Sequence, residues 1–166
     1  METFTISDPV CEPILLADTK TFLRLDTDDH DSFLKYAIAE HRDALEKHLG
    51  IVMGNRHCGV EGYVDGEARL PHWPISQVES VKVDLEPDTA ATIDMGARPC
   101  TISVKGTGVV TVRYTAGYGT CPSDIPAPLR QAMLLLVARA YERRCSAPAV
   151  MPLMVDALTM PYRVVS

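Results

Sequence analysis

VRYTAGYGTCPSDIPAPLRQAMLLLVARAYERR, residues 112–144, passes from a β-branched stretch through a turn rich in glycine and proline into a long apolar segment. Pro126 and Pro128 fall where the first helical turn needs no backbone donor, so we expect a helix over about 126–144. One stripe at helical spacing should face the core: Leu129, Ala132, Met133, Leu136, Val137, Ala140 and Tyr141. Outside that stripe lie Leu134, Leu135 and Ala138, so the helix is either wrapped by its own domain or covers a neighbouring subunit.

The composition bounds the class of protein. A length of 166 residues suits one domain whose core needs no disulfide or metal. The 22 acidic and 16 basic residues give a formal charge of −6, which argues against a general nucleic-acid binder. Five scattered cysteines without a CxxC pairing favour free thiols in a reducing compartment. The sequence shows no signal peptide and no apolar run that could span a bilayer, so we expect synthesis in the cytoplasm and no membrane partner.

The rest of the chain divides into helical and β-rich parts. Residues 31–50 have a helical apolar stripe ending at Gly50, and a short helix should lie within residues 15–25. Between residues 78 and 119 three stretches alternate or are β-branched. Turn signals occur at Asp65-Gly66, before these stretches, and at 105–108, where the turn would join two of them as a hairpin. We therefore predict a single α+β domain over 1–166, mainly helical, with helices at about 15–50 and 126–144 and an inserted antiparallel β-sheet or hairpin region at about 51–121. The C-terminal tail at about 148–166, broken by prolines, should be extended and hold a short helix at best.

The acidic run from Asp26 to Asp31 does not fit a calcium loop. An EF-hand loop requires glycine at its sixth position and glutamate at its twelfth, where this chain has Asp31 and Ala37. We interpret the acidic run as helix capping and solvation.

Other chemical motifs also fail. His41 and His48 lack the HExxH order of zinc hydrolases, and His57-Cys58 would need metal ligands from elsewhere. GYGTCPSD, residues 117–124, lacks the Gly-Lys-Ser/Thr ending of a phosphate-binding loop. A catalytic cysteine or serine needs a base and an orienting acid, and the sequence identifies neither for Cys121 or Ser123. We predict no enzyme activity, no catalytic residue, no metal and no cofactor.

The order of motifs resembles the head-tail connector, or adaptor, proteins of tailed bacteriophages and gene transfer agents. The stretches that carry the resemblance are LADTKTFLRLDTDDHDSFLKYAIAEHRDALEKHLG (16–50), LPHWPISQVESVKV (70–83), residues 112–144, and PYRVV (161–165). They contain the family's Asp-Asp step into a long helix, its Pro-x-x-Pro entry to a strand, and its Tyr-x-Ala-Gly-Tyr-Gly turn before a proline-led helix. The scattered cysteines are not explained by this pattern.

The resemblance implies a structural virion protein at the head-tail interface. Such proteins form a homo-oligomeric ring, expected as a dodecamer on the portal, that joins the DNA-filled capsid to the stopper or tail. Negative charge would let DNA pass the channel without sequence-specific binding. The portal-binding residues expected on this basis are Arg143, Arg144, Tyr162, Arg163, Val164 and Val165, and those of the subunit interface are Leu134, Leu135 and Ala138. A small metal-dependent hydrolase and a host regulatory binding module remain the alternatives.

Overall fold

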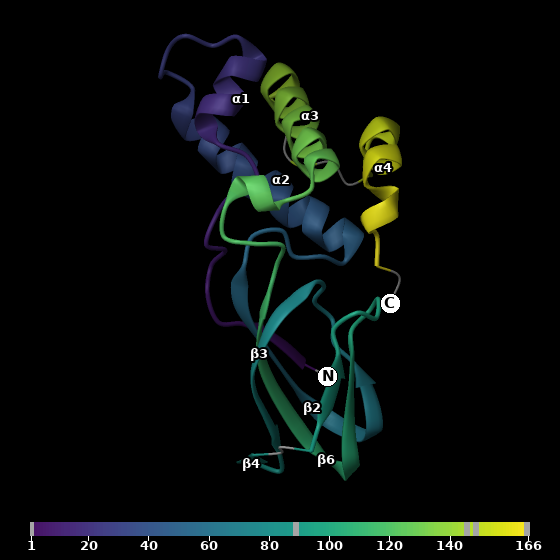
Figure 1. Cartoon of the computed structure of the whole chain (residues 1–166). Coiled ribbons are helices and arrows are strands. Elements are labelled where there is room, and N and C mark those ends of the chain that lie inside the picture. The colour runs from purple at the N-terminus through teal and green to yellow at the C-terminus, as the bar shows by residue number, and fades with distance from the viewer. Residues whose placement is uncertain (1, 88–89, 145–146, 148–149, 165–166) are drawn as a thin grey trace.

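Helices and strands form two layers in the computed structural model, which describes residues 2–87, 90–144, 147 and 150–164 (Figure 1). These residues contain four α-helices and one antiparallel sheet of six strands, which confirms the α+β class. Helix makes up 37% and strand 31%, so the expected predominance of helix is not clearly confirmed. The elements are β1 (Glu2–Thr5), α1 (Leu16–Leu23), α2 (Asp31–Leu49), β2 (Arg56–Arg69), β3 (Ile75–Val83), β4 (Glu86–Pro87), β5 (Thr92–Asp94), β6 (Thr101–Ala116), the 3-10 turn η1 (Pro122–Asp124), α3 (Ala127–Arg143), α4 (Leu153–Thr159) and the 3-10 turn η2 (Met160–Tyr162).

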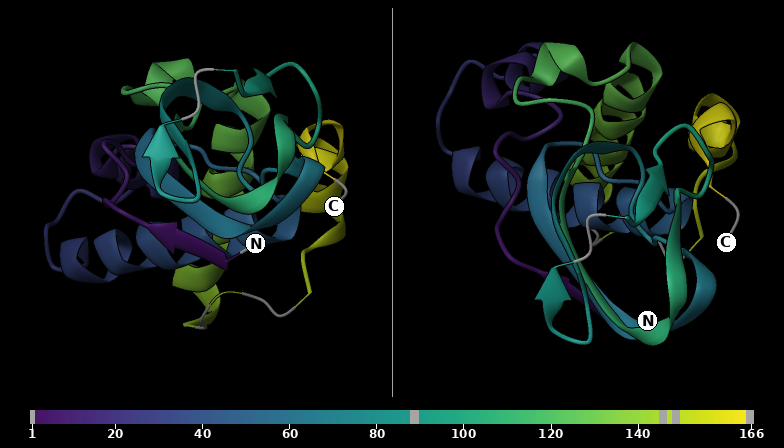
Figure 2. Two further views of the ribbon diagram at one scale, coloured as in Figure 1. Left: turned by 90° about the horizontal axis from the view of Figure 1, so that it is seen from below. Right: turned by 60° about the horizontal axis from the view of Figure 1, so that its bottom comes forward.

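Two long strands, β2 and β6, form the centre of the sheet. The strand order is β1-β2-β6-β3-β4, with β5 also pairing with β6, and the sheet curls strongly when viewed along its length (Figure 2). The predicted turns at Asp65-Gly66 and at 105–108 are wrong, because both sites lie inside these strands. Asp65 pairs with Thr107 and Glu67 with Ser103, so the positive-φ residues Gly66 and Gly106 form an irregularity in the pairing instead of reversing the chain. The strands therefore continue past these glycines as one bent ribbon.

The helical layer follows the predicted apolar stripes. On α2 the buried side chains include Leu34, Ile38, Leu45 and Leu49, and on α3 the buried set is Leu129, Ala132, Met133, Leu136, Val137 and Ala140. Helix α3 packs against α1, α2 and α4 (Figure 1). No helix in the described part of the chain is both long and apolar enough to cross a membrane.

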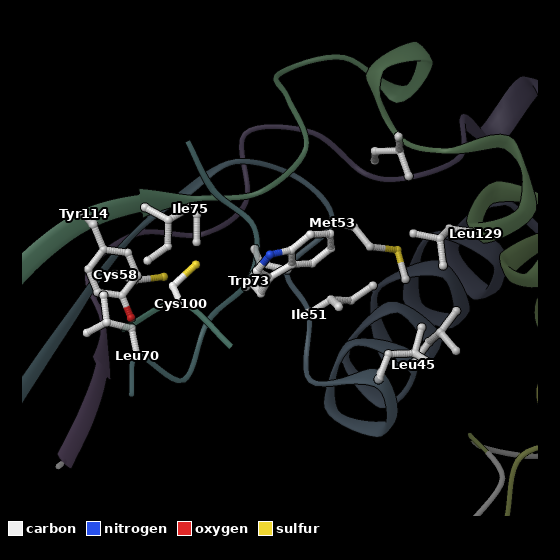
Figure 3. Packing of buried hydrophobic residues seen from close by; sticks show 14 of the residues in the cluster. Leu45, Ile51, Met53, Cys58, Leu70, Trp73, Ile75, Cys100, Tyr114 and Leu129 are labelled. Atoms are coloured by element: carbon white, nitrogen blue, oxygen red, sulfur yellow. The ribbon is translucent and has the colours of Figure 1, made fainter. Parts of the chain in front are cut away.

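The interior of the sheet and the helical layer share one core (Figure 3). Trp73 lies in the middle, with Tyr114, Cys58 and other sheet residues on one side and Ile51 and Met53 leading to the helices on the other. The rings of Tyr118 and Trp73 pack edge to face, with their centroids 5.7 Å apart. The guanidinium carbon of Arg98 lies 4.1 Å from the centroid of the Trp73 ring. The two layers are thus expected to unfold together.

The tail, expected to be extended with a short helix at best, contains the short helix α4. Pro152 was interpreted as a helix breaker, but it stands at the N-cap of α4, where its carbonyl accepts the Asp156 amide at 2.9 Å. Proline is compatible with this position because the first helical turn has no intrahelical partner for its N–H groups. The side chains of Val155 and Thr159 bury the inner face of α4 against the rest of the chain.

A half-buried histidine, His72, makes the stability of the protein dependent on pH. Burial, with a smaller effect from the Arg56 charge, lowers the pKa of His72 from 6.5 to about 4. The hydroxyl oxygen of Tyr114, which stays neutral because burial raises its pKa, lies 2.6 Å from His72 Nδ1. The unfolded histidine therefore takes up a proton at a higher pH than the folded one, and the stabilisation present above pH 6.5 is lost as pH falls toward 4.

We expect the free energy of unfolding of the wild type to fall by about 2 kcal/mol more than that of a His72→Gln variant over this interval. Glutamine can still accept the Tyr114 hydroxyl but does not titrate, and the carboxylates common to both proteins cancel in the comparison. Urea unfolding at pH 7 and pH 4.5 measures the difference. Equal losses in the two proteins would show that His72 is not held neutral by the fold.

Candidate interaction surfaces

The Tyr-x-Ala-Gly-Tyr-Gly turn positions the start of α3. At Gly117, φ is +135° and an added Cβ would lie 2.6 Å from the Asn55 backbone, so this position requires glycine. The carboxylate of Asp124 then accepts the amides of Thr120 and Cys121 at 3.1 and 3.0 Å and closes the turn before the helix. The motif therefore has a structural role: it shapes the turn that directs α3 away from the end of β6.

The α3 residues predicted to meet a neighbouring subunit are half-buried within the protomer. Leu134 and Leu135 pack in part against the chain's own core, and Ala138 is also of intermediate exposure. Because α3 contacts α1, α2 and α4, its own domain wraps much of the helix. Part of the surface of these three residues is nevertheless exposed to solvent and available to a neighbouring subunit. Their role in a subunit interface is a proposal.

The residues predicted to bind a portal lie in two separate places. The Arg144 guanidinium is 5.7 Å from the ring centroid of Phe33, near the start of α2, whereas the Val164 amide donates to the Leu49 carbonyl, at the end of α2, at 2.8 Å. With a rise of 1.5 Å per residue, these contacts are about 24 Å apart along the helix. Arg143 is exposed beside Arg144, and Val165 lies outside the described residues.

The final described residues of the tail line a hollow of about 780 Å³ between α2, the sheet and α4. Tyr162 and Val164 pack in part against the core, while the side chain of Arg163 is exposed. Lys47 and Arg69, also exposed, lie on the same hollow, and no ion pair within the described residues engages these three cations. This side of the molecule is therefore positively charged although the chain as a whole is acidic.

An apolar face on α4 was missed by the sequence interpretation. Leu153, Met154 and Ala157 of α4 are exposed, as is Met160 at its C-cap, and they share one side of the helix, opposite the buried Val155 and Thr159. Their positions i, i+1, i+4 and i+7 carry a helical signal in LMVDALTM, residues 153–160. The signal was overlooked because prolines flank the segment on both sides.

The polar clusters are accounted for by local ion pairs and hydrogen bonds. Lys20 pairs with Asp28 and, at 3.0 Å, with Asp31, so part of the acidic run is neutralised by α1. His57 Nδ1 lies 2.5 Å from Glu79 Oε1 on the exposed side of the sheet. Among the described residues, no three histidines, cysteines or acids come together as a metal site. The described cysteines, Cys11, Cys58, Cys100 and Cys121, are free thiols, and Cys145 lies outside the described part.

Comparison with known proteins agrees with this architecture. Residues 13–92 match the family model of the phage gp6-like head-tail connector proteins. The neck of an empty GTA particle with C6 symmetry contains a chain that is 24% identical, with a TM-score of 0.79. The neck of a native GTA particle with C12 symmetry and the virion of a native GTA particle contain chains that are 26% identical, with TM-scores of 0.74. Each match covers 100% of this chain and 97% of the other.

No curated protein sequence matches the chain. The expected resemblance is confirmed independently by the sequence of the first half and by the fold of the whole. Residues 13–92 thus match the head-tail connector family model, and the whole chain has a fold similar to that of chains in the necks of GTA particles.

Proposed function

We propose that this chain is the repeating subunit of a ring in the neck of a phage or gene transfer agent particle. The observation that carries the proposal is the match of the whole chain, at 26% identity, to a chain from a GTA neck with C12 symmetry. The ring lies beneath the portal and joins the DNA-filled capsid to the stopper or tail. The C12 symmetry of that neck supports twelve copies on the portal as part of the proposal.

The charge of the subunit supports passage of DNA through such a ring. A formal charge of −6 on each copy gives a dodecamer a strongly negative field, which repels phosphates instead of retaining them. In this proposal the open parts of Leu134, Leu135 and Ala138 contribute to contacts between neighbouring subunits. Burial of such half-open apolar surface in every copy would favour a closed ring.

The portal contact is proposed on the C-terminal segment, with Arg163 as its exposed cation. Tyr162 and Val164 contact the protomer's own core, so they must detach at least in part to serve as an aromatic and a β-prone anchor for a partner. Arg143 and Arg144 lie at the other end of α2 and would meet a separate part of the portal. The side chain of Arg163 can bind a partner without any rearrangement of the core.

Reversal of one charge tests this portal contact. We expect Arg163→Glu to weaken co-purification of the full-length chain with its portal by about tenfold or more, because an interface cation is replaced by an anion. Arg113→Glu, a change of equal charge at an exposed site on β6, is the matched control and should bind as the wild type does. Both variants should keep the circular dichroism of the wild type. Equal portal binding by the two variants would remove the C-terminal segment from the contact.

A further inference from the structure

The outer face of α4 is the most exposed apolar surface among the described helices. Leu153 is 84% exposed, Met154 65% and Met160 72%, and the small Ala157 lies between them. A side chain that packs in its own core would be largely covered, as Val155 and Thr159 are on the opposite face. A contiguous apolar helix face of this kind marks a contact with another molecule.

The position of α4 in the protomer is fixed by contacts that leave this face free. His48 Nε2 lies 2.8 Å from Asp156 Oδ1, which joins α4 to the last turn of α2. On the inner side, the Thr159 hydroxyl donates to the Val155 carbonyl at 2.8 Å, so this buried hydroxyl finds its hydrogen-bond partner within α4. The helix therefore presents its apolar side outward as a ridge on the body of the subunit.

An apolar groove lies on the other side of the same subunit. It has a volume of about 400 Å³, and its lining consists of Cys11, Glu12, Ile14, Leu15, Leu16, Lys35, Ile38 and Pro122. Leu15 is half exposed at its edge. These residues come from the segment that enters α1, from the first half of α2 and from the start of η1.

The elements that carry the ridge and those that line the groove lie on opposite sides of the subunit. The purple α1 segment lies on one side of the molecule and the yellow α4 on the opposite side (Figures 1 and 2). The ridge is anchored at the end of α2, whereas the groove is lined by residues of its first half. Two different patches on opposite sides of one chain produce head-to-tail contacts, which close into a ring when the rotation allows it.

We propose that the outer face of α4 docks into the Cys11–Leu16 groove of the neighbouring copy. The occupant is a second copy of this chain because the same subunit carries both an exposed apolar ridge and an apolar groove, on the two sides that a ring contact must use. The inference rests on the ring proposed above and names the surfaces that build it. The half-buried α3 residues Leu134 and Leu135 belong to the helix that packs against α4.

A charge placed on the ridge tests the contact. We expect Leu153→Asp to reduce the ring population of the full-length chain by about tenfold or more, because the contact would bury an unpaired carboxylate. The melting temperature should stay within about 3 °C of the wild type, since the residue is largely exposed in the protomer. Leu85→Asp, at a site that is 81% exposed on the far end of the sheet, is the matched control and should assemble normally.

Native mass spectrometry, with the chain alone and with its portal, measures the ring population. A Leu153→Asp variant that forms rings as the wild type does would overturn the docking proposal while the ring itself stands. A variant that forms rings alone but no longer joins the portal would assign α4 to the portal and also overturn it. If the wild type forms no ring in either setting, the proposed function fails, and this inference fails with it.

A cross-link tests the identity of the groove. The native thiol of Cys11 lies in the groove, and Met154→Cys places a second thiol on the ridge. A Cys121→Ser background is used because Cys121 is exposed and near Cys11. Burial raises the pKa of Cys11, so oxidation with diamide is carried out at mildly alkaline pH.

We expect a ladder of disulfide-linked species that continues beyond the dimer and disappears on reduction. Head-to-tail docking leaves one free ridge and one free groove after each step, whereas a symmetric pair would stop at the dimer. The ladder should be absent when Cys11→Ser is added, and absent when the new thiol is placed by Leu85→Cys instead. A ladder that persists without Cys11, or a product that stops at the dimer, would overturn the proposal.

Discussion

Trp73→Ala is expected to lower the free energy of unfolding by about 3–5 kcal/mol, because it removes a large buried ring where little can collapse to fill the space. Trp73 is 8% exposed and lies between the cluster inside the sheet and the cluster against the helices (Figure 3). The ring also carries the edge contact with Tyr118 and lies under the Arg98 guanidinium. Its loss would therefore separate two parts of one core.

Urea unfolding followed by far-ultraviolet circular dichroism measures this loss. Fluorescence cannot be compared between the two proteins, because Trp73 is the only tryptophan of the chain. Trp73→Phe keeps an aromatic ring at the site and should cost clearly less than the alanine change. A Trp73→Ala protein whose unfolding free energy lies within about 1 kcal/mol of the wild type would show that the layers do not share a core.

Glu46→Ala should cost a similar amount, about 3–5 kcal/mol, because it leaves the Arg56 cation, whose side chain is only 15% exposed, without its partner. The Glu46 carboxylate is buried in the last turn of α2, where Oε1 accepts the Met53 amide at 2.7 Å and Oε2 pairs with the Arg56 guanidinium at the start of β2. Burial raises the pKa of Glu46, and the charge of Arg56 opposes this shift. One carboxylate thus connects the helical layer to the first long strand of the sheet.

Glu46→Gln is the matched variant for this prediction. Its amide oxygen can still accept the Met53 amide, so the change should cost less than alanine while it still removes the ion pair with Arg56. Urea unfolding at pH 7 ranks the three proteins. If Glu46→Ala and Glu46→Gln were equally stable, the Met53 hydrogen bond would contribute nothing, and a wild-type-like Glu46→Ala would refute the ion pair as a joint between the layers.

The sequence predicted the helices well because their faces depend on local spacing. The stripe from Leu129 to Ala140 is buried as expected, and α3 begins at Ala127, next to the predicted start at Pro126. The sheet was harder, since Gly66 and Gly106 were read as turns. A glycine with positive φ serves a hairpin and an irregularity within a strand equally well, and only the long-range pairing of β2 with β6 decides between them.

The candidate sites could be predicted only in part for the same reason. Arg144 and Arg163 were expected to bind the same partner, the portal, on the basis of the resemblance to the connector family. Their separation depends on the direction in which α3 crosses α2, which no local pattern specifies. Likewise, the prolines beside α4 suggested an extended tail, although Pro152 is compatible with the start of a helix.

Electron microscopy of the full-length chain bound to its purified portal tests the central claim most directly. The account predicts a closed ring of twelve copies, coaxial with the portal, in which each α4 lies against the α1 side of the next copy. Single copies scattered on the portal, or a portal with no bound ring at saturating protein, would contradict it.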